Sequence, residues 1–150
     1  MRRVVVTGIG TINSTGHNVK DSFKAVVDGV CGIDTITLFD ASEFSVKIAG
    51  EVKDFDPTTV MDKKEVKKAD RFIQLGIKAA LEAMIDSGYV TQEDKKVDAS
   101  IADRFGMISG SGIGGLSTIE RNSIVCETKG SRKVSPFFIP SSLANMLSGF

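Results

Sequence analysis

The chain has 150 residues, of which 41% are hydrophobic and 25% are charged. This composition is typical of a globular protein with an apolar core, and the length suits one domain. Lysine plus arginine equals aspartate plus glutamate, at 19 each, so the zero net charge argues against a nucleic-acid-binding protein. The chain lacks an apolar run long enough to span a membrane, and a cytoplasmic protein is expected. Cys31 and Cys126 form neither a disulfide framework nor a metal site, and both are expected to be buried.

The first third of the chain predicts a strand, a helix and a second strand. The β-branched run at residues 3–7 favours a strand buried on both faces, as in a parallel sheet. Asn18 is a good N-cap, and a helix from there should end at Gly29. Residues 30–45 look irregular, whereas the alternation over residues 46–53 favours a half-exposed strand. The apolar face of the first helix comprises Val19, Phe23, Val26 and Val27.

The middle of the chain predicts its longest helix. Apolar residues recur at helical spacing over residues 70–87, and Gly88 is the expected stop. A short charged helix over residues 62–68 precedes it, and residues 91–103 predict a surface loop or a short helical excursion. Small residues on the long helix, which suggest that another element packs closely against it, are Gly76, Ala79 and Ala83.

Residues 105–115 predict a buried strand that ends in a glycine turn. Gly110, Gly112 and Gly115 match the dinucleotide-binding pattern G-x-G-x-x-G. That pattern also requires an acidic residue about twenty positions on, at the end of a second strand. Residues 134–137 hold no acid, so nucleotide binding is disfavoured. The turn indicates instead that the backbone passes close to another group.

The last third predicts a helix, an extended segment and a final helix. The first of these helices should span residues 116–126. Residues 134–140 are expected to be extended, because the residue before a proline is disfavoured in the α region. Pro140 suits the first turn of the final helix, whose apolar pattern runs to Phe150 and indicates that the natural protein is longer. His17, the one histidine, lies in a polar turn and is expected to have a capping or solvated role.

Five stretches together resemble the amino-terminal part of the elongating β-ketoacyl-acyl-carrier-protein synthases of type II fatty acid synthesis. The isoleucine within the glycine turn and the paired phenylalanines after Ser135-Pro136 resemble the second, longer-chain isoform. The resemblance covers essentially the whole chain. The matching stretches are residues 3–10, 48–55, 70–74, 110–115 and 135–141.

The resemblance implies an α/β protein with the layered αβαβα thiolase-like fold. Residues 1–150 would form an incomplete part of the first αβ half, without an internal domain boundary. The family is homodimeric and condenses an acyl thioester with malonyl-carrier, with loss of CO₂, by means of a nucleophilic cysteine and two histidines. Those catalytic residues match positions beyond residue 150, so the segment alone is expected to be inactive. Neither a cofactor nor a metal is expected.

The resemblance also assigns two sets of binding residues. Ile113 and Phe138 match residues that line the acyl pocket near the dimer interface, the phenylalanine reaching in from the partner subunit. Residues 64, 67, 68 and 71 have the spacing of one helical face, and local positive charge suits an acidic carrier protein. The alternative role of the basic residues is an ordinary solvated helix face. The alternative role of Ile113 and Phe138 is packing in the core. The basic residues that match carrier-docking positions are Lys64, Lys67, Lys68, Arg132 and Lys133.

Two other interpretations stay open beside a condensing enzyme. The chain could belong to a non-catalytic partner subunit of the same fold, or it could be a truncated, inactive product. A cysteine at the end of the next buried strand would indicate the enzyme, and a glutamine there would indicate the partner subunit.

Overall fold

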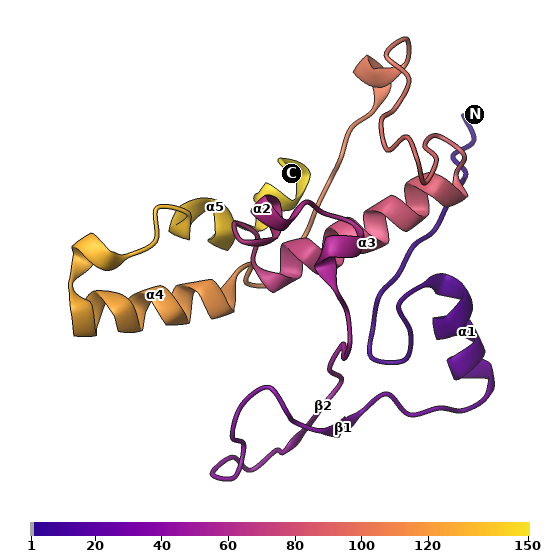
Figure 1. The fold of residues 1–150 in the computed structure, drawn as a ribbon. Coiled ribbons are helices and arrows are strands. Elements are labelled where there is room, and N and C mark those ends of the chain that lie inside the picture. The colour runs from indigo at the N-terminus through magenta and orange to yellow at the C-terminus, as the bar shows by residue number, and fades with distance from the viewer. Residues whose placement is uncertain (1) are drawn as a thin grey trace. The chain divides into compact units, whose positions relative to one another are not determined.

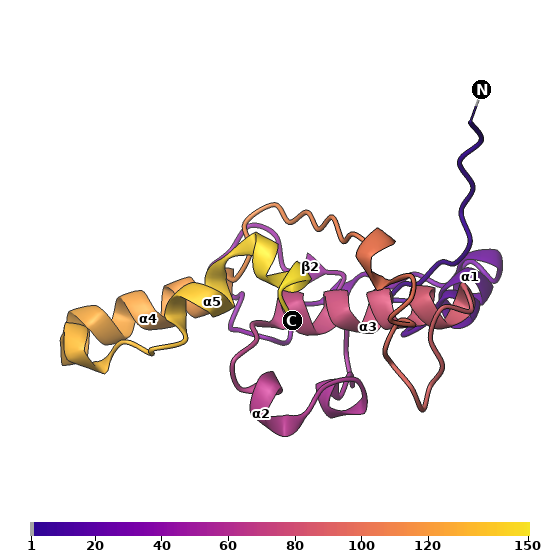
Figure 2. The same ribbon diagram turned by 90° about the horizontal axis from the view of Figure 1, so that it is seen from above.

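The computed structural model describes residues 2–150, which form two compact units (Figures 1 and 2). The first unit comprises residues up to Asp56 together with Ala79–Lys95. The second comprises Pro57–Lys78 and Lys96–Phe150. Helix α3 (Arg71–Asp86) contributes its first half to the second unit and its second half to the first. Across the described residues, no helix is long and apolar enough to cross a membrane.

Helix α1 (Val19–Val27) has the predicted ends, but the face that it buries lies beside its apolar face. The Asn18 side chain caps it by accepting a hydrogen bond from the Asp21 N–H, and the chain leaves it through Gly29 at φ 69°. The buried residues are Ser22 and Ala25. The apolar face named from the sequence is therefore not the buried face of this helix in the described structure. The preceding loop packs against Ser22, because the Asn13 amide donates to its hydroxyl at 3.0 Å and a Cβ atom at Gly16 would lie 2.5 Å from its backbone nitrogen. The exposed residues of the predicted face are Phe23, Val26 and Val27.

The N-terminal segment packs closely on the second half of α3, as the small residues of this helix predict. A Cβ atom at Gly8 would lie 2.2 Å from the Ala83 carbonyl oxygen, and one at Gly10 would lie 2.0 Å from that of Ala79. Only glycine fits such an approach. Hydrogen bonds run from the Ile9 N–H to Asp86 at 2.9 Å and from the Thr11 N–H to Glu82 at 3.1 Å.

The strand predicted at residues 3–7 is not formed in the described structure. Val4 is 96% exposed and Val6 is 82% exposed, where burial on both faces was expected. The sheet that the described residues form has only two short antiparallel strands, β1 (Asp34–Thr35) and β2 (Ile48–Ala49). A buried parallel strand requires neighbours that lie far along the chain, and these two strands do not supply them.

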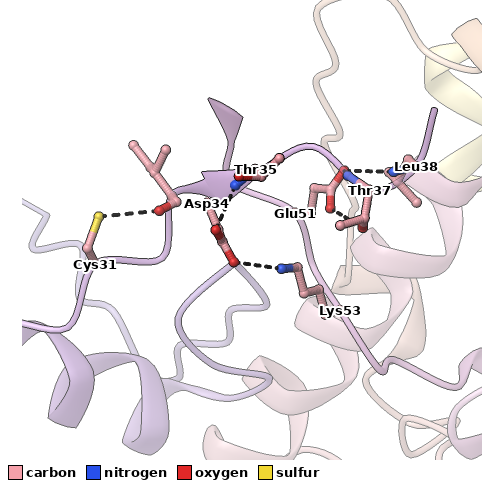
Figure 3. Close-up of polar contacts among 8 residues, drawn as sticks. Cys31, Asp34, Thr35, Thr37, Leu38, Glu51 and Lys53 are labelled. Carbon is pink, nitrogen blue, oxygen red and sulfur yellow. Dashed lines mark hydrogen bonds and ion pairs between the residues drawn. The ribbon is translucent and has the colours of Figure 1, made fainter. Parts of the chain in front are cut away.

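The hairpin of β1 and β2 is held by charged side chains from its second arm (Figure 3). The Glu51 carboxylate accepts from the Thr37 N–H at 2.9 Å, the Thr37 hydroxyl at 2.7 Å and the Leu38 N–H at 3.1 Å. Lys53 Nζ pairs with Asp34 at 3.1 Å. Strand β1 lies within residues 30–45, which were expected to be irregular, and the strand predicted over residues 46–53 is confirmed only at β2.

Hydrogen bonding lowers the pKa of two carboxyl groups in this hairpin. The hydrogen bonds from Thr37 hold the pKa of Glu51 below its ordinary value. At Asp34, the backbone hydrogen bond from Thr35 lowers the pKa most, and Lys53 adds to the effect. Both groups face water, so the hairpin gains local order rather than a large stabilisation.

The second unit is built from short helices around the first half of α3. Ile73 of α3 is fully buried, and Ala69 just before the helix is also buried. A Cβ atom at Gly76 would lie 2.5 Å from the Leu147 side chain, so this small residue also marks a close contact. The other helices are η1 (Pro57–Thr59), α2 (Lys63–Val66), η2 (Ala102–Arg104), α4 (Leu116–Lys129), η3 (Ser131–Lys133), α5 (Phe138–Ser142) and η4 (Ala144–Ser148).

Several predictions for the second unit need correction. The strand expected before the glycine turn is not formed in the described part of the chain, and Ile108 is completely exposed. Residues 134–140 are not extended throughout, because the chain turns at Pro136 and α5 begins at Phe138. The final helix is interrupted at Leu143, which has φ −75° and ψ 128°. Helix α4 is confirmed and runs three residues further than predicted, to Lys129.

The two cysteines and the histidine differ in their surroundings. Cys31 and Cys126 are both exposed free thiols, so the prediction that they are buried is wrong. Helix α4 buries Asn122 and leaves Cys126 facing outward. His17 Nε2 lies 2.8 Å from the Lys53 carbonyl oxygen, and its ring packs edge-on against Phe55. His17 therefore joins its turn to the segment at Lys53 and Phe55, which is neither the capping nor the solvated role expected from the sequence.

Candidate functional site

The glycine turn makes its close approach to the backbone of α5. Gly114 has φ 81°, and a Cβ atom there would lie 2.4 Å from the Ser142 carbonyl oxygen. A Cβ atom at Gly115 would lie 2.5 Å from the Ser141 carbonyl oxygen. The Gly115 N–H donates to the Ser142 carbonyl at 3.0 Å. The second half of the glycine turn is therefore explained by packing within the chain.

The first half of the same turn is open. A Cβ atom at Gly110 or Gly112 would meet nothing within 4 Å among the described residues. Ile113, which lies between the open and the packed halves, is 65% exposed. Its alternative role as a core residue is thus not supported in the part of the chain that the structure describes.

Phe138 is the first residue of α5 and is half-buried. The Ser142 hydroxyl, one turn later, donates to the Phe138 carbonyl at 2.6 Å. Because the Gly115 N–H bonds to the Ser142 carbonyl, the turn that carries Ile113 and the helix that carries Phe138 are joined directly. The structure thus links the elements of both predicted pocket residues.

Asp70 fastens the start of α4 to the start of α3. Its Oδ2 atom accepts hydrogen bonds from the Thr118 N–H at 3.0 Å and from the Thr118 hydroxyl at 2.5 Å. Thr118 lies in the first turn of α4, where N–H groups lack partners within the helix. A carboxylate there also complements the helix dipole. Sequence reasoning missed this contact. An aspartate at this position is expected to cap the helix that directly follows it. The hydrogen bonds to Thr118 instead place Asp70 at the start of α4, which begins 46 residues later, at Leu116.

A buried asparagine closes the other side of α4. Asn122 donates to the Thr118 carbonyl at 2.8 Å and accepts from the Ser135 N–H at 2.9 Å. The segment that leads into α5 is therefore held against the same helix.

The basic residues near α2 lie on two elements rather than on one helical face. Helix α2 ends at Val66, residues 67–69 form a turn and bend, and α3 begins at Arg71. The prediction of one continuous face is therefore wrong, because the helical spacing is interrupted. Lys64 and Lys67 are nevertheless both exposed.

Lys68 differs from its neighbours because it is engaged within the protein. Its ammonium group lies 2.8 Å from Glu65 and 5.9 Å from the centre of the Phe137 ring. Its carbonyl oxygen accepts a hydrogen bond from the buried Ser141 hydroxyl. Lys68 thus connects the basic segment to the segment that carries Phe138.

Arg132 and Lys133 lie in η3, directly after α4, and both are exposed. They precede the Ser135–Phe137 segment that Asn122 holds. The basic residues near α2 are therefore linked to α5 through Lys68. Arg132 and Lys133 lie in the segment of the chain that leads into α5.

One cavity of about 140 Å³ lies in the second unit, and none of the predicted site residues lines it. Its walls are Val60, Met61, Glu65, Ile77 and Phe150, and neither predicted pocket residue belongs to them. Among residues 2–150, no cluster of three or more histidine, cysteine or acidic side chains could hold a metal ion.

Comparison with solved structures defines the class of fold. The chain superimposes on a ketosynthase solved with a type II polyketide acyl-carrier protein, with a TM-score of 0.76 and 26% identity. The match covers 99% of this chain and 38% of that ketosynthase. The predicted α/β fold of the thiolase-like ketosynthases is thus confirmed.

The family model for the N-terminal domain of β-ketoacyl synthases matches residues 1–150, and the chain belongs to this family. A relative from Vibrio harveyi named 3-oxoacyl-[acyl-carrier-protein] synthase 2 is 49% identical over 99% of the chain. A relative of the same name from Coxiella burnetii is 45% identical over the same share. The chain spans about a third of the length of these relatives, 34% in each case.

Proposed function

We propose that this chain is the amino-terminal part of an elongating 3-oxoacyl-acyl-carrier-protein synthase of fatty acid synthesis. The complete enzyme would join an acyl thioester to malonyl-carrier with loss of CO₂. The observation that carries the proposal is the 49% identity, over 99% of the chain, to a relative with this printed name. We place the enzyme in the cytoplasm as a homodimer.

The chemistry of this reaction belongs to residues beyond position 150. A cysteine that follows the next buried strand would take the acyl group as a thioester, and two histidines would assist decarboxylation and condensation. The part described here contributes binding: a surface for the carrier protein and part of the wall of the acyl pocket.

The docking surface consists of Lys64, Lys67, Lys68, Arg132 and Lys133. Four of these residues are exposed, and the chain as a whole is neutral, so the positive charge is local. A local patch of this kind accelerates encounter with an acidic protein by electrostatic steering. The fold supports this role further, because Lys68 joins the surface to Phe137 and Ser141 beside the proposed pocket residue.

The acyl pocket would include Ile113 from the glycine turn and Phe138 from α5. Ile113 has glycine on both sides, at Gly112 and Gly114, so it supplies the large side chain of this part of the turn. Its exposure leaves it available to a ligand or to a second subunit. An apolar wall suits an acyl chain, since each buried methylene contributes roughly 0.8 kcal/mol.

The test uses the complete enzyme with acyl-carrier and malonyl-carrier substrates. The Lys64→Glu/Lys67→Glu variant should bind the carrier protein about 5- to 100-fold more weakly, mainly through slower association. The loss should shrink as salt is raised. The matched control is Lys20→Glu/Lys47→Glu, which makes the same charge change at exposed lysines of the first unit. Transfer from a short acyl thioester without a carrier should be unchanged in both variants.

Three results would contradict the proposal. Absence of condensation by the wild-type enzyme would refute the function itself. Equal weakening by the control variant would show that the charge effect is not local to the docking surface. Equal losses with carrier-bound and carrier-free donors would assign the lysines a structural role.

A further inference from the structure

We propose that Asp70 is a positioning residue that sets the selectivity of the enzyme for acyl-chain length by holding the glycine turn. This inference rests on the proposed function, because it takes Ile113 to be part of the acyl pocket. It adds a residue that does not itself line the pocket and that comes directly after the docking segment.

The geometry that carries the inference is a single carboxylate oxygen bound to both polar groups of one residue. Asp70 Oδ2 accepts from the N–H and the hydroxyl of Thr118, and 48 positions separate the two residues. A Cβ atom at Gly115 would lie 3.2 Å from this same oxygen. Asp70 Oδ2 therefore lies beside Gly115, with no room for a further side-chain carbon atom between them, two residues after Ile113.

The turn has a second support on its other side. The Gly115 N–H bonds to the Ser142 carbonyl, and Gly114 lies against the same carbonyl. The packed half of the turn is thus held between Asp70 and α5, whereas Gly110 and Gly112 are open. Removal of Asp70 leaves the α5 contact and the Ser111 hydroxyl, which accepts from the Gly114 N–H at 2.9 Å, so the turn that carries Ile113 is held less firmly relative to Phe138.

Asp70 also lies two residues after Lys68. The Lys68 carbonyl accepts from Ser141, so the backbone just before Asp70 is tied to α5 as well. The docking surface, the glycine turn and α5 therefore meet within three residues of the chain.

The decisive measurement compares short and long acyl-carrier substrates with the complete enzyme. Asp70→Ala removes the carboxylate that accepts the two hydrogen bonds from Thr118. This variant should lower the preference for long over short acyl chains about tenfold, which is about 1.4 kcal/mol. Asp70→Asn keeps one carbonyl acceptor for Thr118 and should restore the preference to within about threefold of wild type. Thr118→Val removes the hydroxyl alone and should give an intermediate loss.

The chain supplies a matched control. Asp98 likewise accepts from the N–H and the hydroxyl of one residue, Ser100, both at 2.7 Å, but the two residues lie within one surface loop. Asp98→Ala loses the same kinds of hydrogen bond without releasing the turn. It should leave the chain-length preference and the melting temperature close to those of wild type.

The outcomes separate this inference from the proposed function. Wild-type enzyme that does not condense acyl and malonyl groups would refute both. An active wild type whose Asp70→Ala variant loses activity equally with every chain length would overturn the positioning role alone. If Asp70→Ala fails to fold, Thr118→Val decides: an unchanged chain-length preference in that variant overturns the inference.

Discussion

Substitution of Gly114 by alanine tests the packing of the glycine turn most directly. The added Cβ atom would lie 2.4 Å from the Ser142 carbonyl oxygen, about 1 Å inside ordinary van der Waals contact. Backbone must move to relieve this overlap, and overpacking of this kind costs about 1–3 kcal/mol. Gly114 also has φ 81°, a left-handed conformation that costs an alanine about 1–2 kcal/mol more. We therefore expect Gly114→Ala to destabilise the complete enzyme by roughly 2–5 kcal/mol.

The same turn contains the matched control. A Cβ atom at Gly112 would meet nothing within 4 Å, and Gly112 is not in the left-handed region. Gly112→Ala should therefore change the free energy of unfolding by no more than about 1 kcal/mol, in the stabilising direction. Chemical denaturation of both variants measures the difference. Equal destabilisation by the two substitutions would refute the reasoning, because it would mean that the open half of the turn is also tightly covered.

Two further predictions concern the pocket and the hairpin. Ile113→Phe should fill the space of about three methylenes and lower the use of long acyl chains by roughly 2–3 kcal/mol, or about 30- to 150-fold. Short chains should be little affected, and a uniform loss with a lower melting temperature would assign Ile113 to the core. The lowered pKa of Glu51 means that its stabilisation is complete above the unfolded-state value of about 4.3 and is lost as the pH falls through the lower folded-state value. Protection of the Thr37 amide from hydrogen exchange, measured against the rate of an unstructured chain at the same pH, should thus fall on acidification in wild type. Glu51→Gln should flatten this dependence, and Glu43→Gln, in the same loop, should not.

Helix boundaries could be predicted from the sequence because local chemistry determines them. The Asn18 side chain accepts from the N–H of Asp21 as a cap does, and Gly29 and Gly88 adopt the positive φ that ends a helix. The small residues of α3 correctly predicted close packing, since Gly10 lies against Ala79. These features depend on residues that are near in the sequence or on the absence of a side chain.

Strands and faces could not be predicted in the same way, because they depend on distant partners. The run at residues 3–7 has the composition of a buried strand, but Val4 is exposed and the described residues supply no paired neighbour. The charge spacing from Lys64 onward suggested one helical face, although a turn after Val66 interrupts it. The preference of residues before a proline for an extended backbone likewise did not predict the turn at Pro136, before α5.

The candidate site was only partly visible in the sequence. The resemblance identified Ile113, Phe138 and the basic residues, and their roles stay predictions. The link from Asp70 to Thr118 spans 48 positions and gives no local signal, so only the folded arrangement reveals it.

The exposed valines near the amino terminus have a consequence for biosynthesis. Val4, Val5 and Val6 are translated before nearly all of the described chain, which provides no cover for them. At roughly 5–20 residues per second, translation from Val6 to Phe150 takes on the order of 7–30 s. For all of this time the nascent chain carries an uncovered apolar segment, which is the kind of segment that ribosome-associated chaperones hold. Faster elongation would shorten the interval in which this segment can aggregate with those of neighbouring nascent chains on the same polysome.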